Sequence, residues 1–288
     1  MTRNYQKVLN DTLFITTNNH KFEVQAYFID LDGTLLDQEI RKKMSKLNLE
    51  TVKERNKHFP VVISTGRSYN KKVINLMKIL DTQYVICQNG SIIADKEGNI
   101  LLDIRLKTEQ IKQIIPIIKK YRFGFTINSQ YKLCSFSKRF FLWKLIFWHK
   151  LKRAETFDVN SEHVNKIVIG GTLRRKKLFK VLDEIKATVP NISAKVSGND
   201  YIIEITDKNA TKGTGAQFVA NILKVDVKKT IHIGDSQNDA TTIGIVGALI
   251  AMKNASKKLL EVATHVGPNN TRSGLAKILN GDFKEVKR

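Results

Sequence analysis

Five short apolar runs recur along the chain, and four of them are followed directly by a polar residue or glycine. They are AYFI (26–29), VVIS (61–64), YVIC (84–87), TIHI (230–233) and ALIA (248–251). Short runs of this kind are typical of strands buried on both faces, as in a parallel sheet. The pattern therefore predicts a central parallel sheet whose strands come from two distant parts of the chain.

Segments with helical spacing lie between these runs. In 73–80 and again in 216–223, apolar residues fall at positions i, i+3, i+4 and i+7, so each segment presents one apolar helix face. We expect the first of these helices to begin near Ser68. The alternation of strands and helices predicts an α/β fold with a Rossmann-like, doubly wound core.

The middle of the chain has a different pattern. Helical spacing at 111–118 and 178–185 is accompanied by the strand-like stretches FGFTI (123–127) and KIVIGG (166–171). Because the buried-strand runs resume only after this region, it is expected to be an α+β unit inserted into the first.

The predicted organisation has three parts. Residues 1–24 are weakly patterned and are expected to be an N-terminal extension. The core is expected to combine 25–106 with 197–288, and the inserted unit to span 107–196.

The composition adds a strong charge to this picture. The 288 residues include 49 Lys and Arg against 27 Asp and Glu, a formal net charge of +22. With 42% hydrophobic and 26% charged residues the chain is typical of a folded globular protein, which excludes disordered and collagen-like classes. The charge itself indicates anionic partners.

Cysteine use and hydropathy indicate a soluble cytoplasmic protein. Cys87 and Cys134 have no neighbouring Cys or His at metal-ligand spacing, which is typical of a reducing compartment. Residues 1–19 lack the apolar segment of a signal peptide. The most apolar stretch, 140–148, contains Lys144 and is too short to span a membrane.

The first candidate for chemistry is FIDLDGTLLD, at 28–37. Asp30 and Asp32 come directly after a predicted buried strand and are followed by Gly33, where the chain must turn. Ligands of open α/β sheets bind beyond the carboxyl ends of the strands. Two close carboxylates repel each other, so a hard divalent cation is expected beside them.

A second acidic group follows another predicted strand, in IHIGDSQNDA (231–240). If this strand lies in the same parallel sheet, Asp235 and Asp239 meet Asp30 and Asp32 at one edge. Four acids at one site need a counter-charge. Mg²⁺, which prefers carboxylate, water and phosphate oxygens, fits this arrangement.

Two further stretches are suited to binding anions. VVISTGRS (61–68) places Thr65 and Gly66 after a strand, where a hydroxyl and an unobstructed amide can meet a phosphate. NATKGTGA (209–216) places Lys212 at the expected start of a helix, whose amides also attract negative charge. Arg67 remains open, since it can pair with the sheet edge or contact a substrate.

Taken in order, D-x-D-G-T, S-T-G-R, K-G and G-D-S-x-N-D resemble the motifs of the haloacid dehalogenase superfamily. The insert between the second and third motifs, with ICQNG (86–90) and IAMKNAS (250–256), resembles the Cof-type phosphatases with a type IIB cap. The resemblance extends over nearly all of the chain after about residue 25. It implies that the insert is a cap that selects substrates.

The resemblance also implies roles for individual residues. Asp30 would attack phosphorus and form an aspartyl-phosphate, while Asp32 would protonate the leaving alcohol and then activate water. The transferring phosphoryl group would be held by Thr65, Lys212, Asn238 and the amides of Leu31 and Gly66. Mg²⁺ would be bound by the side chains of Asp30 and Asp235 and the carbonyl of Asp32, with Asp239 and Ser236 supporting the metal shell.

The expected function is Mg²⁺-dependent hydrolysis of small phosphate monoesters such as sugar phosphates, nucleotides or phosphorylated cofactors. No obligate protein partner is implied. A phosphomutase or phosphotransferase on the same fold stays open. So does a basic protein that binds nucleic acid or a membrane surface, because residues 138–150 interleave aromatic and basic side chains. A cap helix with one buried face is the favoured interpretation of that segment, which makes such binding secondary.

Overall fold

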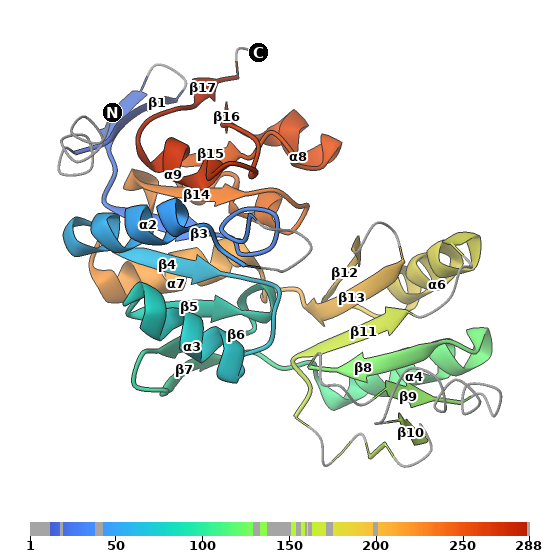
Figure 1. Cartoon of the computed structure of the whole chain (residues 1–288). Helices are drawn as coiled ribbons and strands as arrows, with labels where there is room; N and C mark the ends of the chain where they lie inside the picture. Colours follow the sequence, from blue (N-terminus) through green and yellow to red (C-terminus); the bar gives the residue numbers. More distant parts are fainter. Residues whose placement is uncertain are drawn as a thin grey trace. The chain divides into compact units, whose positions relative to one another are not determined.

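The chain divides into two compact units, each with its own sheet. The first unit comprises Met1–Leu102 and Thr211–Arg288, and the second Asp103–Ala210. The computed structural model (Figure 1) describes residues 12–17, 20–37, 43–128, 133–136, 151–153, 157–158, 160, 163–170, 175–197 and 201–286. Segment 138–150 lies outside these residues. Among the described helices, none is long and apolar enough to cross a membrane.

The first unit is built on a nine-stranded sheet in the order β17-β16-β15-β14-β3-β4-β5-β6-β7. Its strands are β3 (Ala26–Ile29), β4 (Val61–Ser64), β5 (Tyr84–Cys87), β6 (Ile92–Asp95), β7 (Ile100–Asp103), β14 (Thr230–Gly234), β15 (Ala248–Ala251), β16 (His265–Val266) and β17 (Lys284–Glu285). Six neighbouring strands pair in parallel, namely β16, β15, β14, β3, β4 and β5. The flanking strands β17 and β6 pair antiparallel with β16 and β5. The five predicted strands and the Rossmann-like core are thus confirmed.

The order of the parallel strands, β5-β4-β3-β14-β15-β16, is that of a doubly wound fold. Successive strands β3, β4 and β5 are added toward one edge of the sheet, and successive strands β14, β15 and β16 toward the other edge. The direction of winding therefore reverses between β3 and β14, where such folds bind their ligands.

Helices cover both faces of this sheet because successive strand residues point to opposite sides. One apolar cluster joins Tyr27 and Ile29 to α2 (Lys46–His58), α3 (Lys71–Leu80) and α9 (Gly274–Leu279). A second joins Phe28 to α7 (Lys212–Leu223), and a third joins Leu249 to α8 (Lys257–Val262). Short 3₁₀ turns lie at Gln88–Gly90 (η1), Val227–Lys229 (η3) and Asp239–Thr242 (η4).

The amino-terminal side chains set where two of these helices begin. Asn70 Oδ1 accepts hydrogen bonds from the amides of Lys72 and Val73, so α3 starts at Lys71 and not near Ser68. Thr211 and Thr214 form a reciprocal capping box at the start of α7. That box holds Lys212 at the first helical position.

The described part of the expected N-terminal extension belongs to the first unit. Strands β1 (Phe14–Thr17) and β2 (His20–Glu23) form an antiparallel hairpin. Ile15 and Val24 are buried in the same apolar cluster as β3. The described residues of the expected extension therefore pack on the first unit, because their few apolar side chains add to its core.

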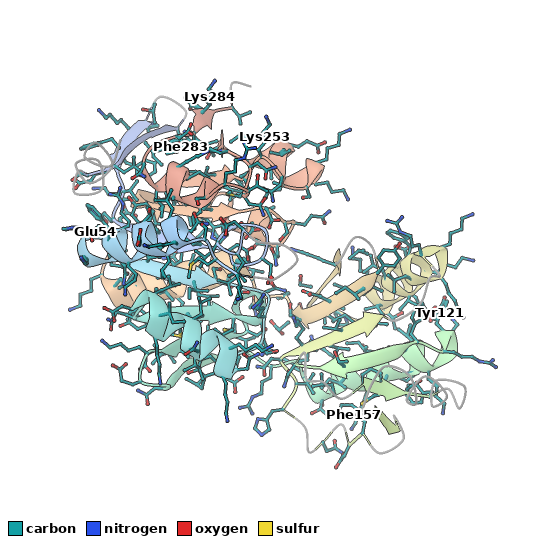
Figure 2. All side chains as sticks on the ribbon, in the orientation of Figure 1. Glu54, Tyr121, Phe157, Lys253, Phe283 and Lys284 are labelled. Carbon is teal, nitrogen blue, oxygen red and sulfur yellow. The ribbon has the colours of Figure 1, made fainter. Side chains whose placement is uncertain are left out.

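The second unit has a six-stranded sheet in the order β10-β9-β8-β11-β13-β12. Its strands are β8 (Gly124–Ile127), β9 (Leu133–Ser135), β10 (Leu151–Arg153), β11 (Lys166–Gly170), β12 (Ile192–Ser197) and β13 (Ile202–Asp207). The helices α4 (Thr108–Tyr121) and α6 (Arg175–Thr188) share one apolar cluster with the sheet. Lys120 Nζ and Tyr121 Oη each donate to Glu184 Oε2 at 2.8 Å and so tie α4 to α6. Tyr121 is labelled in Figure 2.

The second unit is longer than the predicted insert at both ends. It begins at Asp103 rather than 107 and ends at Ala210 rather than 196. The larger difference arises at β13, which the predicted boundary places in the core but which pairs with β11 and β12. In β13, Ile203 and Ile205 are buried while Glu204 is only partly buried, the alternation typical of a sheet covered on one face.

Candidate active site

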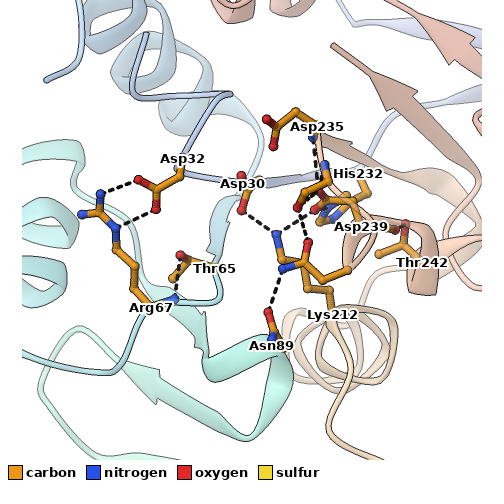
Figure 3. Close-up of polar contacts among 12 residues, drawn as sticks. Asp30, Asp32, Thr65, Arg67, Asn89, Lys212, His232, Asp235, Asp239 and Thr242 are labelled. Atoms are coloured by element: carbon orange, nitrogen blue, oxygen red, sulfur yellow. Dashed lines mark hydrogen bonds and ion pairs between the residues drawn. The ribbon is translucent and has the colours of Figure 1, made fainter. Parts of the chain in front are cut away.

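The site lies where the winding of the first sheet reverses. Asp30 directly follows β3, and Asp235 directly follows β14, its neighbour in the sheet. The two strand ends are joined by a hydrogen bond from the Asp30 amide to the Ile233 carbonyl, 2.9 Å long. The predicted meeting of the two acidic motifs is therefore observed (Figure 3).

A buried lysine connects these motifs. Lys212 Nζ donates to Asp30 Oδ1 at 2.5 Å and to Asp239 Oδ1 at 2.7 Å. The Lys212 side chain is 0% exposed, and so is that of Asp239. Since an ammonium group has three N–H donors, one remains beyond these two contacts for a further acceptor.

Asp239 is held by contacts to both of its carboxylate oxygens. Its Oδ1 also lies 2.7 Å from His232 Nε2, while its Oδ2 accepts from the amides of Asp235 at 3.1 Å and Ser236 at 2.9 Å. Gly234 makes room for this carboxylate, because a Cβ there would lie 2.2 Å from Asp239 Cγ. Asp239 is thus fixed by strand β14 and by the loop that follows it.

Burial and charge shift the acidity of these groups. Burial raises the pKa of Asp30 well above its usual value, and the charges of Asp239 and Asp235 add to this rise. Burial also raises the pKa of Asp235, to about 7. Burial would raise the pKa of Asp239 as well, but Lys212 and His232 outweigh it and lower that pKa below its usual value.

The same acids fit a divalent cation. Single carboxylate oxygens of Asp30, Asp235 and Asp239 all lie within 4.8 Å of one another. Among the described residues Asp235 Oδ1 is buried and has no hydrogen-bond partner. A buried anionic oxygen without a partner is costly, and a cation at this point would satisfy it. Asp32 contributes no side-chain oxygen to this group.

The loop after β3 is shaped around Asp235. Gly33 has φ +83°, and a Cβ there would lie 2.1 Å from Asp235 Oδ2. Asn254 Nδ2 donates to the Gly33 carbonyl at 3.0 Å and lies 3.4 Å from Asp235 Oδ2. The IAMKNAS stretch thus links the two acidic loops, a contact that sequence reasoning did not assign to Asn254.

The predicted phosphate-binding residues gather beside this cluster. Thr65 is buried at the end of β4, and its hydroxyl accepts from the Arg67 amide at 3.1 Å. A Cβ on Gly66 would lie 3.0 Å from Asn89 Oδ1 and 3.6 Å from Asn238 Nδ2, so the Gly66 backbone faces both amides. Asn238 Nδ2 in turn donates to Asn89 Oδ1 at 2.8 Å.

Two other predicted positions are placed by the loops themselves. Ser236 Oγ donates to Asn238 Oδ1 at 2.6 Å and approaches Asp239 Oδ2 at 3.2 Å, which orders the loop after β14. Leu31 is fully buried between the two aspartates of its motif, and its carbonyl accepts from the Leu36 amide at 2.8 Å.

Asp32 is turned away from Asp30 and toward Arg67 (Figure 3). Arg67 Nε donates to Asp32 Oδ2 at 2.7 Å, and Arg67 Nη2 donates to Asp32 Oδ1 at 2.6 Å. This bidentate pair engages both carboxylate oxygens. In this structure Arg67 thus binds an acidic residue of the site, a contact that sequence reasoning did not consider.

Sequence reasoning missed three side chains of the site, namely His232, Asn89 and Asn254. His232 was treated only as part of a strand, although a histidine inside a buried apolar run is itself a signal. Asn89 lies in the left-handed region with φ 60°, as does Gln88 with φ 51°. Two consecutive residues with such torsions are a sign of a constrained functional loop.

Comparison with known proteins agrees with this geometry. The haloacid dehalogenase-like hydrolase family matches residues 27–279. A putative phosphatase of Buchnera aphidicola is 28% identical over 273 residues, covering 89% of this chain and 96% of the relative. A phosphoglycolate phosphatase of Archaeoglobus fulgidus is 24% identical over 264 residues, covering 90% of this chain and 96% of the relative.

The fold is also found among solved structures. A sugar phosphatase described as haloacid dehalogenase subclass IIB superposes with a TM-score of 0.72 at 18% identity, covering 89% of this chain and 98% of the other. The family match extends from β3 through α9 and so includes every residue of the buried acidic cluster. The chain therefore belongs to the haloacid dehalogenase-like hydrolases.

Proposed function

We propose that this hydrolase cleaves phosphate monoesters of small metabolites in the presence of Mg²⁺, through an aspartyl-phosphate on Asp30. Candidate substrates are sugar phosphates, nucleotides and phosphorylated cofactors. The observation that carries the proposal is the buried contact of Lys212 with Asp30 and Asp239, at the point where ligands of this fold bind. The phosphatase names of the relatives support the same reaction.

The acidic cluster would hold the metal. Asp30 and Asp235 would supply side-chain oxygens and Asp32 its carbonyl, while Asp239 and Ser236 would order the surrounding loop. When bound, Mg²⁺ supplies positive charge that stabilises the phosphoryl oxygens and keeps the buried carboxylates ionised. The unpartnered Asp235 Oδ1 is the clearest sign of this need.

The residues then divide the chemistry. Asp30 would attack phosphorus while the ester bond breaks, and the leaving alcohol would take its proton from Asp32. Water would next attack the same phosphorus, give its proton to Asp32 and release inorganic phosphate and free Asp30. Because the Asp32 side chain points toward Arg67 and away from Asp30, it would turn toward Asp30 to transfer the proton.

The phosphoryl oxygens would be held by donors on three loops and at the start of α7. Lys212 has an N–H beyond its two carboxylate contacts, and Thr65, Asn238 and the amides of Leu31 and Gly66 complete the set. Residues 103–210 would act as a cap that selects the organic part of the substrate. The +22 charge would draw anionic esters to the molecule.

The function is tested by a Mg²⁺-dependent screen of phosphorylated metabolites and p-nitrophenyl phosphate, with Asp32→Asn as the diagnostic variant. We expect Asp32→Asn to lower steady-state turnover about 10²–10⁴-fold, because general acid and base catalysis are lost. With p-nitrophenyl phosphate, whose leaving group needs little protonation, rapid quenching should still show one burst of product per site.

Equal turnover of Asp32→Asn and wild type would contradict the role of Asp32. Phosphate transfer to an added alcohol in preference to water would indicate a phosphotransferase. Absence of turnover across the panel, together with salt-sensitive nucleic-acid binding, would favour the binding alternative.

A pair of glycine variants separates site geometry from general stability. In Gly234→Ala the added methyl meets the Asp239 carboxylate, whereas in Gly244→Ala it meets nothing within 4 Å but sits at φ +74°. We expect each variant to lose about 1–3 kcal/mol in urea unfolding, by overpacking and by backbone strain respectively. Only Gly234→Ala should also lose phosphatase activity, and equal activity of the two variants would argue against a catalytic need for the Asp239 position.

A further inference from the structure

His232 lies in the middle of a buried strand and yet carries a polar ring. In the sheet it stands in register between Phe28 on β3 and Leu249 on β15. The His232 side chain is 0% exposed, and burial lowers its pKa despite the nearby Asp239. Burying an imidazole in apolar surroundings is unfavourable unless its N–H donates a hydrogen bond, so we expect His232 to have an acceptor nearby.

That partner is Asp239, and the contact defines which ring nitrogen carries the proton. His232 Nε2 lies 2.7 Å from Asp239 Oδ1, whereas Nδ1 is buried without a partner among the described residues. The ionised Asp239 carboxylate can only accept hydrogen bonds. His232 must therefore donate from Nε2, and Nδ1 is the bare nitrogen.

The same Asp239 oxygen accepts from Lys212 Nζ, also at 2.7 Å. Its other oxygen is already bonded to the amides of the loop after β14. His232 thus closes the set of donors around Asp239, and Asp239 in turn sets where the ammonium of Lys212 lies. A chain of contacts runs from His232 through Asp239 and Lys212 to Asp30 Oδ1.

We propose that His232 is a positioning residue for catalysis, which holds Asp239 so that Lys212 is aimed at Asp30 and at the transferring phosphoryl group. This inference rests on the proposed phosphatase function. It assigns His232 no contact with substrate and no proton transfer. His232 limits rotation of the Asp239 carboxylate. If that carboxylate rotated, the Lys212 ammonium would move away from Asp30 and the transferring phosphoryl group.

The decisive variants are His232→Leu and His232→Gln. Leucine fills the space of the imidazole but has no hydrogen-bond donor. The glutamine Nε2 lies about as far from the backbone as the histidine Nε2 and can donate to Asp239 in its place. His265→Leu is the matched control, because His265 is also buried in this sheet but bonds Thr264 and makes an edge-to-face contact with Phe283. We expect His232→Leu to lower kcat and kcat/KM equally, by about 10–100-fold, with glutamine restoring most of the loss.

A second readout does not depend on turnover. In the metal-free protein, side-chain ¹⁵N NMR should show the neutral Nε2–H form of His232. The Lys212 Nζ signal should shift in His232→Leu but not in His265→Leu. An Nδ1–H form, or an unmoved Lys212 signal, would overturn the proposal whether or not the protein is a phosphatase.

The kinetic outcomes are equally clear. A wild-type kcat in His232→Leu would overturn the positioning role. So would equal losses of kcat in the leucine and glutamine variants, if each loss matched the loss of thermal stability in the same variant. If the wild-type protein turns over no phosphate ester at all, the proposed function fails, while the NMR experiment still decides whether His232 sets the position of Lys212.

Discussion

Asp30→Asn is expected to abolish turnover, lowering kcat for p-nitrophenyl phosphate by at least about 10⁴-fold. The amide cannot attack phosphorus, and removing a nucleophile generally costs nearly the whole of the catalysis that its partners support. The measurement is steady-state hydrolysis with a rapid-quench test for phosphorylated protein, which should be absent.

The same variant should remain folded, which makes the loss interpretable. Burial raises the pKa of Asp30, so the ionised form is disfavoured in the metal-free protein and a neutral side chain of the same shape relieves that cost. The asparagine Oδ1 can still accept from Lys212. We expect a change in unfolding free energy of about 1 kcal/mol or less. Turnover above a hundredth of the wild-type rate would contradict Asp30 as the nucleophile.

Lys212→Met is expected to damage both catalysis and stability. The substitution leaves Asp30 and Asp239 buried without their shared counter-charge, and removing one partner of a buried ion pair costs about 3–5 kcal/mol. It also removes a donor to the phosphoryl oxygens, which should lower kcat about 10²–10³-fold. Urea unfolding without metal and steady-state kinetics measure the two effects.

The control is Lys224→Met, the same change at the exposed end of the same helix. Exposed substitutions of this kind usually change stability by less than about 0.5 kcal/mol. In the double variant Asp30→Asn/Lys212→Met, part of the lost stability should return, because one of the two uncompensated carboxylates is gone. Wild-type stability of Lys212→Met would show that the buried contacts are not coupled as described.

The strands that position the site could be predicted because they are apolar throughout. β3, β4, β5 and β15 begin and end where the apolar runs do, and the motifs after β3, β4 and β14 identify acids and anion-binding residues of the site. The helix α2 escaped prediction for the opposite reason. Its buried face carries Asn48, Thr51 and Arg55 beside a single valine, so it has no apolar periodicity.

Two of these buried polar residues, Asn48 and Arg55, bond to the backbone of α9. Asn48 Oδ1 accepts from the Ala276 amide at 3.0 Å, and Arg55 Nη2 donates to the Leu279 carbonyl at 2.7 Å. Partners more than 200 positions away along the chain leave no local signal. The pairs Asp32–Arg67 and His232–Asp239 are only 35 and 7 positions apart, yet no local pattern marks either contact, because it depends on how the loops after the strands fold.

The placement of β3 beside β14 has a consequence for the nascent chain. Until β14 is synthesised, β3 has β4 on one side only, and its four residues, all buried in the finished sheet, border an open edge. Open apolar edges favour aggregation. The ion pair of Lys212 with Asp30 spans 182 positions, and Lys212 also binds Asp239, so the catalytic centre cannot assemble before residue 239 has been synthesised. C-terminally truncated chains should therefore depend on chaperones for solubility.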